Sequence, residues 1–479
     1  MKTRSLVWVS LLLVLAAPAH LSAQAETPSR PNVLFISVDD LRDWVGYLGK
    51  HPQAVTPHFD RLASKGVVFE RAYCAAPSCN PSRAALMSGL RPSTSGVYVN
   101  AQDWRPHIPP ELTLVTTMRK AGYETLAVGK IYHGHWDRHS EWEEYASDRS
   151  RDPQPTGVET GVGAIQFAPL DCSDEEMQDS DVAAYGVRQL SRKHDRPFFL
   201  CVGFHKPHLP WNVPRKYYDL HPLETIQLPP TLEGDLNDVP KMGVNLARHF
   251  GDHEKILKAG KWKEAVRGYL ASISFVDAML GRVLDAFERS EYRDNTIVIL
   301  WSDHGWNLGE KEHWRKFALW EDTTRSPLIV VAPSLTTPGT RCVQPIDLMT
   351  IYPTITDLCG IPTPKHVEGR SLRPLLANPA TDWDQPAIMT WGRNNHAIRA
   401  IGWRYIRYSD GTEELYDESA DPNEWRNLAA NPRYKAEKER LAKWIPERNA
   451  PDVPRRAGES EEDRNTKQKS SSAKQRAVD

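Results

Sequence analysis

The sequence predicts an α/β fold in which a large, mostly parallel sheet is flanked by helices and followed by a smaller antiparallel sheet. Two observations indicate the large sheet. Continuous apolar, β-rich runs are typical of sheets buried on both faces, and segments of helical periodicity lie between them. From about residue 380 onwards, short runs with partial alternation replace this pattern and indicate the small sheet. At 479 residues, the chain is long enough for a large core and two structural units.

Each expected strand of the large sheet ends in a group of polar residues. Ligands of such sheets bind at the carboxyl ends of the strands, so these polar groups are expected to share one site. The strands and the polar residues that follow them are 33–38 with Asp39 and Asp40, 125–128 with Lys130 and His133, 198–202 with His205 and His208, and 296–300 with Asp303 and His304.

Three segments are expected to form helices against this sheet. Residues 262–290 carry apolar side chains at spacings of three and four, which makes one amphipathic stripe. The shorter segments 56–65 and 113–121 are each followed by a glycine, which commonly ends a helix. Because these helices alternate with the strands, they support a parallel arrangement.

The first residues have the features of a secretory signal, expected over residues 1–25. Lys2 and Arg4 form a charged start, residues 6–17 are apolar, and small residues at 23–25 suit cleavage. The apolar run is short of the roughly 20 residues that a spanning helix needs, and no later segment is apolar enough to span a membrane. The protein is therefore expected to be secreted or periplasmic, with no membrane span.

Three regions are expected beyond the signal. Residues 28–379 form the catalytic domain with the large sheet. Residues 380–450 form the C-terminal subdomain, which ends in a helix-like segment at 434–444. Residues 451–479 contain no aromatic residue, leucine or isoleucine and many mixed charges, so a disordered tail is expected there.

Composition excludes several classes of partner. The 60 Lys and Arg residues nearly cancel the 62 Asp and Glu residues, so no global charge favours nucleic acid or an anionic membrane surface. An anionic substrate would need a local cluster of basic groups. Six cysteines over this length do not make a disulfide scaffold, and their pairing cannot be assigned from the sequence.

The most informative segment of the chain is Cys79-x-Pro81-x-Arg83. Pro81 suits a first helical turn, and the apolar run that follows closes on Gly89, so the thiol of Cys79 is expected at a helix N-terminus. Free N–H groups there favour an anion, and Arg83, about one turn along, can bind an oxyanion. The alternative is a buried structural cysteine, since cysteine is among the most buried residue types.

Asp39 and Asp40 are adjacent carboxylates at a strand end, and they repel each other unless a cation lies between them. Hard oxygen ligands suit Ca²⁺ or Mg²⁺. Asp303 and His304 form a second acidic loop at another strand end. A lone pair of aspartates more often caps the next segment, but two such loops together with the cysteine motif favour one metal site.

Together these motifs resemble those of the type I, formylglycine-dependent sulfatases of the alkaline-phosphatase superfamily, and the chain is most similar to the iduronate 2-sulfatases among them. The resemblance starts from Cys79-x-Pro81-x-Arg83 and extends over nearly all of the chain beyond the signal. Further matching segments are 38–42, 128–133, 203–208 and 302–310. Two positions depart from the family pattern. Ser88 stands where threonine is usual, and His304 stands where many members have asparagine.

This resemblance implies an alkaline-phosphatase-like fold and a covalent nucleophile. Cys79 would be converted to formylglycine by a separate maturation enzyme, whereas Cys74 lacks the correctly spaced proline and arginine. The resemblance also implies one Ca²⁺, with Mg²⁺ less expected, held by Asp39, Asp40, Asp303, His304 and the residue at 79. His304 is the weakest match to this ion, because an imidazole is a softer ligand than calcium prefers.

Four further positions match sulfate-binding and proton-transfer residues of the family: Lys130, His133, His208 and Lys316. A sulfate ester has a poor leaving group and a sulfur ringed by negatively charged oxygens, which the site must neutralise. Arg83, Lys130 and Lys316 are expected to do this with the metal ion. His208 is expected to protonate the leaving oxygen with help from Lys316, and His133 to deprotonate the sulfated adduct.

The implied function is an exported sulfatase that removes a 2-O-sulfate from a terminal uronic acid of a sulfated carbohydrate, as in glycosaminoglycan degradation. Alternatives are a sulfatase for another polysaccharide or a small ester such as choline sulfate or an aryl sulfate, and a phosphatase or phosphonate hydrolase of the same superfamily. An exported binding protein without chemistry is a further alternative. Trp306 would either stack on a sugar or pack in the core, and the role of His205 stays open.

Overall fold

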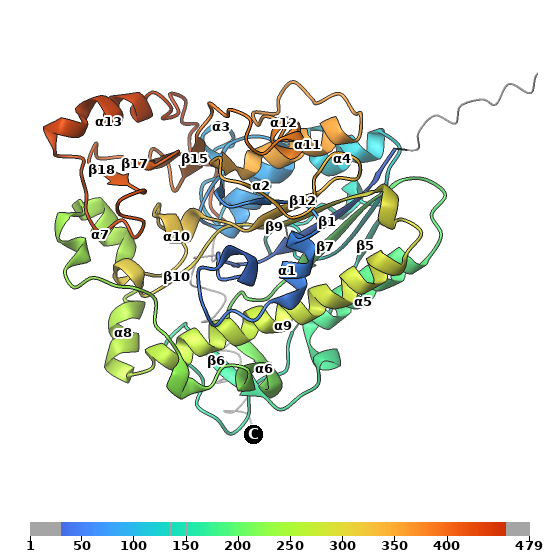
Figure 1. The fold of residues 1–479 in the computed structure, drawn as a ribbon, viewed down its shortest axis with the longest axis horizontal. Coiled ribbons are helices and arrows are strands. Elements are labelled where there is room, and N and C mark those ends of the chain that lie inside the picture. The colour runs from blue at the N-terminus through green and yellow to red at the C-terminus, as the bar shows by residue number, and fades with distance from the viewer. Residues whose placement is uncertain (1–29, 135, 150, 457–479) are drawn as a thin grey trace, which may run out of the picture.

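The computed structural model describes residues 30–134, 136–149 and 151–456 and confirms the α/β fold class (Figure 1). Its centre is an eight-stranded sheet in the order β13-β2-β12-β9-β1-β7-β4-β5. The five strands from β9 to β5 run parallel, whereas β12 pairs antiparallel with β9 and β2. The strands are β1 (Asn32–Val38), β2 (Val67–Phe69), β4 (Glu124–Gly129), β5 (Glu144–Ala146), β7 (Phe198–Phe204), β9 (Thr296–Ser302), β12 (Leu328–Val331) and β13 (Thr340–Cys342).

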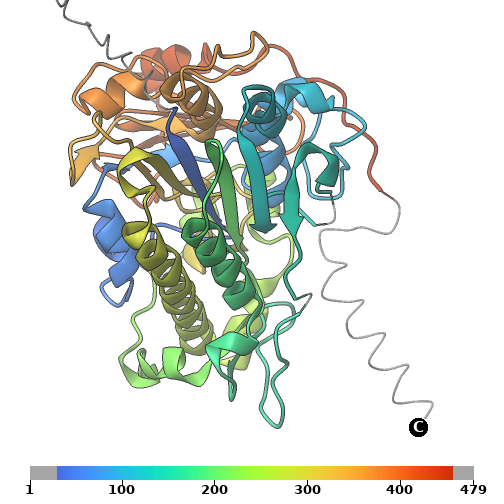
Figure 2. The same ribbon diagram turned by 90° about the vertical axis from the view of Figure 1, so that its right-hand side faces the viewer.

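β1 runs through the middle of the sheet and shows why both faces are covered. Leu34 and Ile36 join one hydrophobic cluster and Val33 and Phe35 the other, because successive side chains of a strand point to opposite faces. Helices α1 (Pro57–Ala63), α5 (Gln178–Ser191) and α9 (Trp262–Arg289) cover the first face, and α2 (Cys79–Ser88), α4 (Leu114–Lys120) and α11 (Ile351–Leu358) cover the second (Figures 1 and 2).

The three helices expected from the sequence are present. The segment 262–290 forms α9, the longest helix among the described residues, and its apolar stripe packs against α5 and α1. The segments 56–65 and 113–121 form α1 and α4. Thr113 caps α4, because its side-chain oxygen accepts a hydrogen bond from the backbone N–H of Thr116 (3.3 Å).

A four-stranded antiparallel sheet follows the large domain. Its strands are β15 (Ala387–Thr390), β16 (His396–Ala400), β17 (Trp403–Arg407) and β18 (Glu413–Asp417), and α13 (Lys435–Ala442) packs on one face through Leu441. Arg404, which is fully buried, donates a hydrogen bond to the Leu319 carbonyl (2.8 Å) and forms an ion pair with Glu321. This small sheet is therefore held against the loop that carries Lys316.

The end of the described chain lies beside the segment that follows α2. The backbone N–H of Val453 donates to the Gly96 carbonyl (3.0 Å), and that of Arg456 donates to the Ala101 carbonyl (2.8 Å). The expected signal, residues 1–25, and the part of the expected tail beyond residue 456 lie outside the described residues.

The other elements complete the two layers. Among the described residues, none of the helices has both the length and the apolar character needed to cross a bilayer.

The remaining α-helices are α3 (Pro92–Ser95), α6 (Arg215–Asp219), α7 (Lys241–Ala247), α8 (Asp252–Ala259), α10 (Glu321–Thr324) and α12 (Arg373–Ala377). The short strand pairs are β3 (Ala72–Tyr73) with β14 (Ile346–Asp347), β6 (Phe167–Leu170) with β8 (Trp211–Pro214), and β10 (Asn307–Leu308) with β11 (Trp314–Arg315).

Candidate active site

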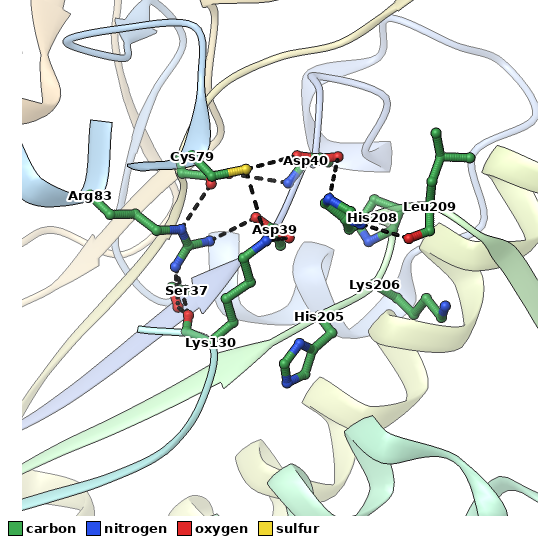
Figure 3. A network of polar contacts seen from close by, with 12 residues as sticks. Ser37, Asp39, Asp40, Cys79, Arg83, Lys130, His205, Lys206, His208 and Leu209 are labelled. Carbon is green, nitrogen blue, oxygen red and sulfur yellow. Dashed lines mark hydrogen bonds and ion pairs between the residues drawn. The ribbon is translucent and has the colours of Figure 1, made fainter. Parts of the chain in front are cut away.

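Most of the predicted site residues gather at the carboxyl ends of four neighbouring strands, where ligands of parallel sheets bind (Figure 3). Helix α2 brings a thiol to the same place from the face it covers. Asp39 and Asp40 follow β1, Lys130 and His133 follow β4, His208 follows β7, Asp303 and His304 follow β9, and Cys79 is the first residue of α2. Lys316 reaches the cluster from the loop after β11.

Cys79 lies at the centre of this cluster. All residues of α2 are buried, and the helix ends at Gly89, whose φ of 73° suits glycine. The Cys79 Sγ atom lies 2.8 Å from Lys316 Nζ, 3.4 Å from His304 Nε2 and 3.6 Å from Asp40 Oδ1. Burial and the nearby Asp39 carboxylate raise the pKa of the Cys79 thiol well above its ordinary value. As an unmodified side chain it therefore stays a protonated thiol, which is a poor nucleophile.

Four side chains form a donor set that fits a divalent cation. One ligand atom each of Asp40, Cys79, Asp303 and His304 lies within 4.8 Å of the others, and all four residues are buried. His304 Nδ1 lies 2.9 Å from the Gly305 carbonyl. Because a carbonyl only accepts, Nδ1 carries the proton and the lone pair of Nε2 faces the carboxylates.

With Nδ1 protonated, the Nε2 acceptor of His304 faces the carboxylate oxygens of Asp40 and Asp303, which are also acceptors. His304 Nε2 lies 3.3 Å from Asp40 Oδ1 and 3.6 Å from Asp303 Oδ2, and burial lowers the pKa of His304, so the ring is neutral. Asp40 Oδ2 is buried and forms no hydrogen bond within the described part of the chain. Converging oxygen and nitrogen lone pairs of this kind need a cation between them, and mostly oxygen donors suit Ca²⁺ or Mg²⁺.

Asp39 lies at the edge of this donor set. Burial alone would raise the pKa of its carboxyl, but Lys130, His208 and Arg83 hold it well below the ordinary range. Lys130 donates to Asp39 Oδ2 and lies 3.8 Å from Cys79 Sγ. Asp39 therefore stays ionised and available to a metal ion.

Arg83 differs from the sequence expectation, in which it binds a substrate oxyanion. The residue is fully buried, and its guanidinium donates to protein groups on every side. Nε donates to Asp303 Oδ2 (2.9 Å), Nη2 to Asp39 Oδ1 (3.1 Å), and Nη1 to the carbonyls of Lys130 (2.6 Å) and Ile131 (3.2 Å). Arg83 thus holds the Asp39 and Asp303 carboxylates in place. The cations available to bind a sulfate group are therefore Lys130 and Lys316.

Lys316 is the cation nearest to the thiol. Its Nζ donates to Asp40 Oδ1 (2.7 Å), and Asp40 and Cys79 outweigh burial and raise its pKa. The neighbours Arg315 and Phe317 both have positive φ values (73° and 81°), a costly backbone that persists where the surroundings fix it. With a raised pKa, Lys316 is a fixed positive charge rather than a proton donor.

His208 stands at the opening of the site and is 36% exposed. Its Nδ1 donates to the Leu209 carbonyl (2.6 Å), which leaves the Nε2 lone pair 3.8 Å from Asp40 Oδ2. Desolvation of the part of the ring that packs into the site, together with the nearby Lys130, lowers the pKa of His208 despite the Asp40 carboxylate. His208 is therefore neutral in the free site, and a general acid at this position must first take up a proton.

Two other predictions from the sequence have different outcomes. His133 is buried after β4, with its ring edge-on to Trp136 at 5.7 Å, and its proton-transfer role stays a prediction. The sugar-stacking alternative for Trp306 is wrong. Its ring is 2% exposed, stacks on Tyr269 and lies 5.6 Å from Lys316 Nζ, so it packs in the core and makes a cation–π contact with that lysine.

Sequence reasoning missed Asp179, the second residue of α5. Its carboxylate is buried and accepts hydrogen bonds from the backbone N–H groups of His205 (2.7 Å) and Lys206 (2.9 Å). This contact fixes the start of the loop that carries His208. The only signal was an acidic residue in a first helical turn, which ordinarily indicates a cap of its own helix.

A cleft of about 490 Å³ opens beside this cluster and is lined by Asp39, Lys130 and His208. A second cleft of about 540 Å³ lies beside Arg42 and Arg325 and contains none of the predicted site residues. Size alone therefore does not identify the site. The smaller cleft is favoured because Asp39, Lys130 and His208, which follow the carboxyl ends of β1, β4 and β7, line it beside the buried donor set.

Comparison with known proteins agrees with this geometry. The sulfatase family matches residues 31–361, and the C-terminal part of N-sulphoglucosamine sulphohydrolase matches residues 309–450. A sulfatase of Formosa agariphila is 37% identical to this chain, over 94% of this chain and 93% of the relative. The choline-sulfatase of Rhizobium meliloti is 30% identical, over 85% and 84% of the two chains. Human iduronate 2-sulfatase is 28% identical, over 75% of each.

Solved structures share the fold. A structure in complex with its substrate D-glucosamine-2-N,6-O-disulfate has a TM-score of 0.70 and 20% identity, and covers 87% of this chain and 97% of its own. The phosphonate monoester hydrolase of Agrobacterium radiobacter has a TM-score of 0.73 and 23% identity, with coverage of 86% and 94%. Identities this low show a shared fold only, so the chemistry of this chain is inferred from its own site.

Proposed function

This chain belongs to the sulfatase family and is a sulfuric ester hydrolase, and from that premise we propose a finer function. The protein is exported, uses a formylglycine made from Cys79, and removes the 2-O-sulfate from a terminal uronic acid of a sulfated glycan. The observation that carries the proposal is the position of Cys79 Sγ, 2.8 Å from Lys316 Nζ and beside the metal donor set. The 28% identity with human iduronate 2-sulfatase supports the choice of substrate.

Each residue of the cluster has a role that its contacts support. A calcium ion held by Asp39, Asp40, Asp303, His304 and the residue at 79 would supply positive charge beside the sulfate oxygens. Formylglycine at 79 would supply a hydroxyl nucleophile in place of the protonated thiol. Lys130 Nζ lies 3.8 Å and Lys316 Nζ 2.8 Å from Cys79 Sγ, so both lysines are placed to neutralise sulfate oxygens beside that position.

His208 is placed to protonate the leaving oxygen. Its Nε2 lone pair faces the site and its side chain borders the cleft. A negatively charged sulfate beside the ring favours the imidazolium, so substrate binding raises the pKa of His208 and supplies the proton needed for catalysis. Lys316, whose pKa is raised, assists as a fixed charge.

Maturation of Cys79 requires access that the folded protein does not give. Cys79 has no exposed surface, and the whole of α2 is buried. A formylglycine-generating enzyme must therefore act on the chain before α2 packs on the face of the sheet. Folded protein with an unconverted Cys79 is expected to resist conversion.

Two disaccharides test the substrate. One carries only a 2-O-sulfated iduronate at the non-reducing end, and the other only a 6-O-sulfated glucosamine. Sulfate release from the first alone, lost in Cys79→Ala protein that folds normally, supports the proposal. Release from the second alone, or from an aryl sulfate and neither disaccharide, rejects the uronate substrate. Faster hydrolysis of a phosphonate or phosphate monoester than of any sulfate ester would contradict the sulfatase activity itself.

Choline sulfate is the second candidate substrate, favoured by the 30% identity with the choline-sulfatase of Rhizobium meliloti. Choline is cationic, so its binding site needs aromatic faces or carboxylates rather than free cations. Sulfate release from choline sulfate with a kcat/KM above that for the iduronate disaccharide would support this alternative.

A further inference from the structure

The cleft beside Cys79 extends beyond the catalytic cluster. Its volume of about 490 Å³ suits a ligand the size of a disaccharide. Asp39, Lys130 and His208 line it, and so do side chains of the chain that follows β5, among them Arg151. A sugar whose sulfate lies at the cluster can therefore place another of its groups against this wall.

The carboxylates on this wall already have partners. Asp148 Oδ2 lies 2.8 Å from His205 Nε2, and Asp152 Oδ2 lies 3.0 Å from Lys206 Nζ. The Lys206 side chain is 5% exposed, so the second pair is shielded from solvent and its charges compensate each other. Neither carboxylate is left to neutralise another cation of the wall.

Arg151 is such a cation. It lines the cleft, is exposed, and forms no ion pair or side-chain hydrogen bond with any residue that the structure describes. Arg149 provides a contrast two positions earlier, because Asp181 binds it through both oxygens at 2.7 and 2.8 Å. The guanidinium of Arg151 is therefore available to an anion that a ligand brings into the cleft.

We propose that Arg151 is a specificity residue that binds the carboxylate of a uronic acid whose sulfate lies at the catalytic cluster. This inference rests on the proposed function and adds the group that recognises the acid. In a uronic acid the C5 carboxylate lies across the ring from O2, so the two anionic groups face different walls of the cleft. Arginine suits a carboxylate because its planar fork donates two parallel hydrogen bonds.

Matched substrates test this subsite. The 2-O-sulfated iduronate disaccharide is compared with the same disaccharide whose carboxyl group has been reduced to a primary alcohol. In Arg151→Gln protein, kcat/KM for the acid is expected to fall by about 10- to 100-fold, mainly through KM, with little change for the alcohol. Arg151→Lys keeps the positive charge but loses the planar fork of the guanidinium. Its kcat/KM for the acid is expected to lie between that of the wild type and that of Arg151→Gln.

The control is Arg289→Gln, which removes an exposed arginine at the end of α9, just before β9 and so at the opposite edge of the sheet. It is expected to leave both substrates unaffected. Equal losses for acid and alcohol in Arg151→Gln, or no loss for either, would overturn the subsite while the 2-O-sulfatase activity of the wild type stands. Hydrolysis of neither disaccharide by wild-type protein that cleaves an aryl sulfate would overturn the proposed substrate and the subsite together.

Discussion

Replacing Arg83 with methionine is expected to lower the free energy of unfolding by about 3–5 kcal/mol, because it leaves buried charges without their partner. Arg83 is fully buried and donates to Asp39 and Asp303, which are also fully buried. Each charge-assisted hydrogen bond lost costs about 1.5–3 kcal/mol, so the two together account for about 3–6 kcal/mol. Asp39 keeps Lys130 as a partner, which places the expected loss in the lower part of that range.

Urea titration measures this loss. Tryptophan fluorescence reports unfolding, and the free energy follows from the midpoint and slope. Calcium at about 100 times its dissociation constant is expected to add about 2.7 kcal/mol to the wild type. Calcium is expected to add more than this to Arg83→Met if the ion replaces part of the positive charge that Arg83 supplies to Asp39 and Asp303. Arg188→Met is the control, because Arg188 is exposed on α5, and its change should stay within about 0.5 kcal/mol. A loss below about 1 kcal/mol in Arg83→Met would refute the reasoning from buried carboxylates.

Three further predictions concern catalysis, metal binding and pH. Lys316→Ala is expected to lower kcat by about 100- to 1,000-fold in a sulfate-release assay, because it removes a positive charge 2.8 Å from the reacting position; an unchanged kcat contradicts that role. Asp303→Asn is expected to weaken calcium binding in calorimetry, since a carboxylate of the donor set becomes an amide; an unaltered affinity excludes Asp303 as a ligand. Burial raises the pKa of Asp277 to about 7, so its stabilising contribution is complete below its unfolded pKa and is lost as pH rises through about 7. The urea midpoint of wild-type protein is therefore expected to fall between about pH 5 and about pH 7 by more than that of Asp277→Asn, and equal falls would contradict the assignment.

Much of the fold and of the site follows from patterns that are local in the sequence. Each apolar run forms a strand that is buried on both faces, because its alternate side chains belong to the two hydrophobic clusters, as those of β1 do. Polar groups at the ends of these runs meet because parallel strands end at one edge of the sheet. Asp40, Asp303 and Lys130 come together for that reason, although they are far apart in the chain.

What the sequence could not predict depends on where packing directs a side chain. An arginine one turn into a helix can face a substrate or the sheet below, and only the position of α2 over β1 and β9 directs Arg83 inward. The stacking of Trp306 on Tyr269 joins residues from separate elements, so no local pattern shows it. Asp179 binds the loop after β7 rather than capping its own helix, which again depends on a contact between elements.

The most direct test of the mechanism relates turnover to the chemical state of residue 79. Trypsin cuts after Arg71 and Arg83, and the peptide between them contains both Cys74 and Cys79, so fragmentation must locate the aldehyde and Cys74 serves as an internal control. Sulfate release per molecule is measured on preparations that differ in the converted fraction of Cys79. If formylglycine is the nucleophile, activity rises in proportion to that fraction and is absent without conversion. Equal turnover by fully unconverted protein would contradict the mechanism.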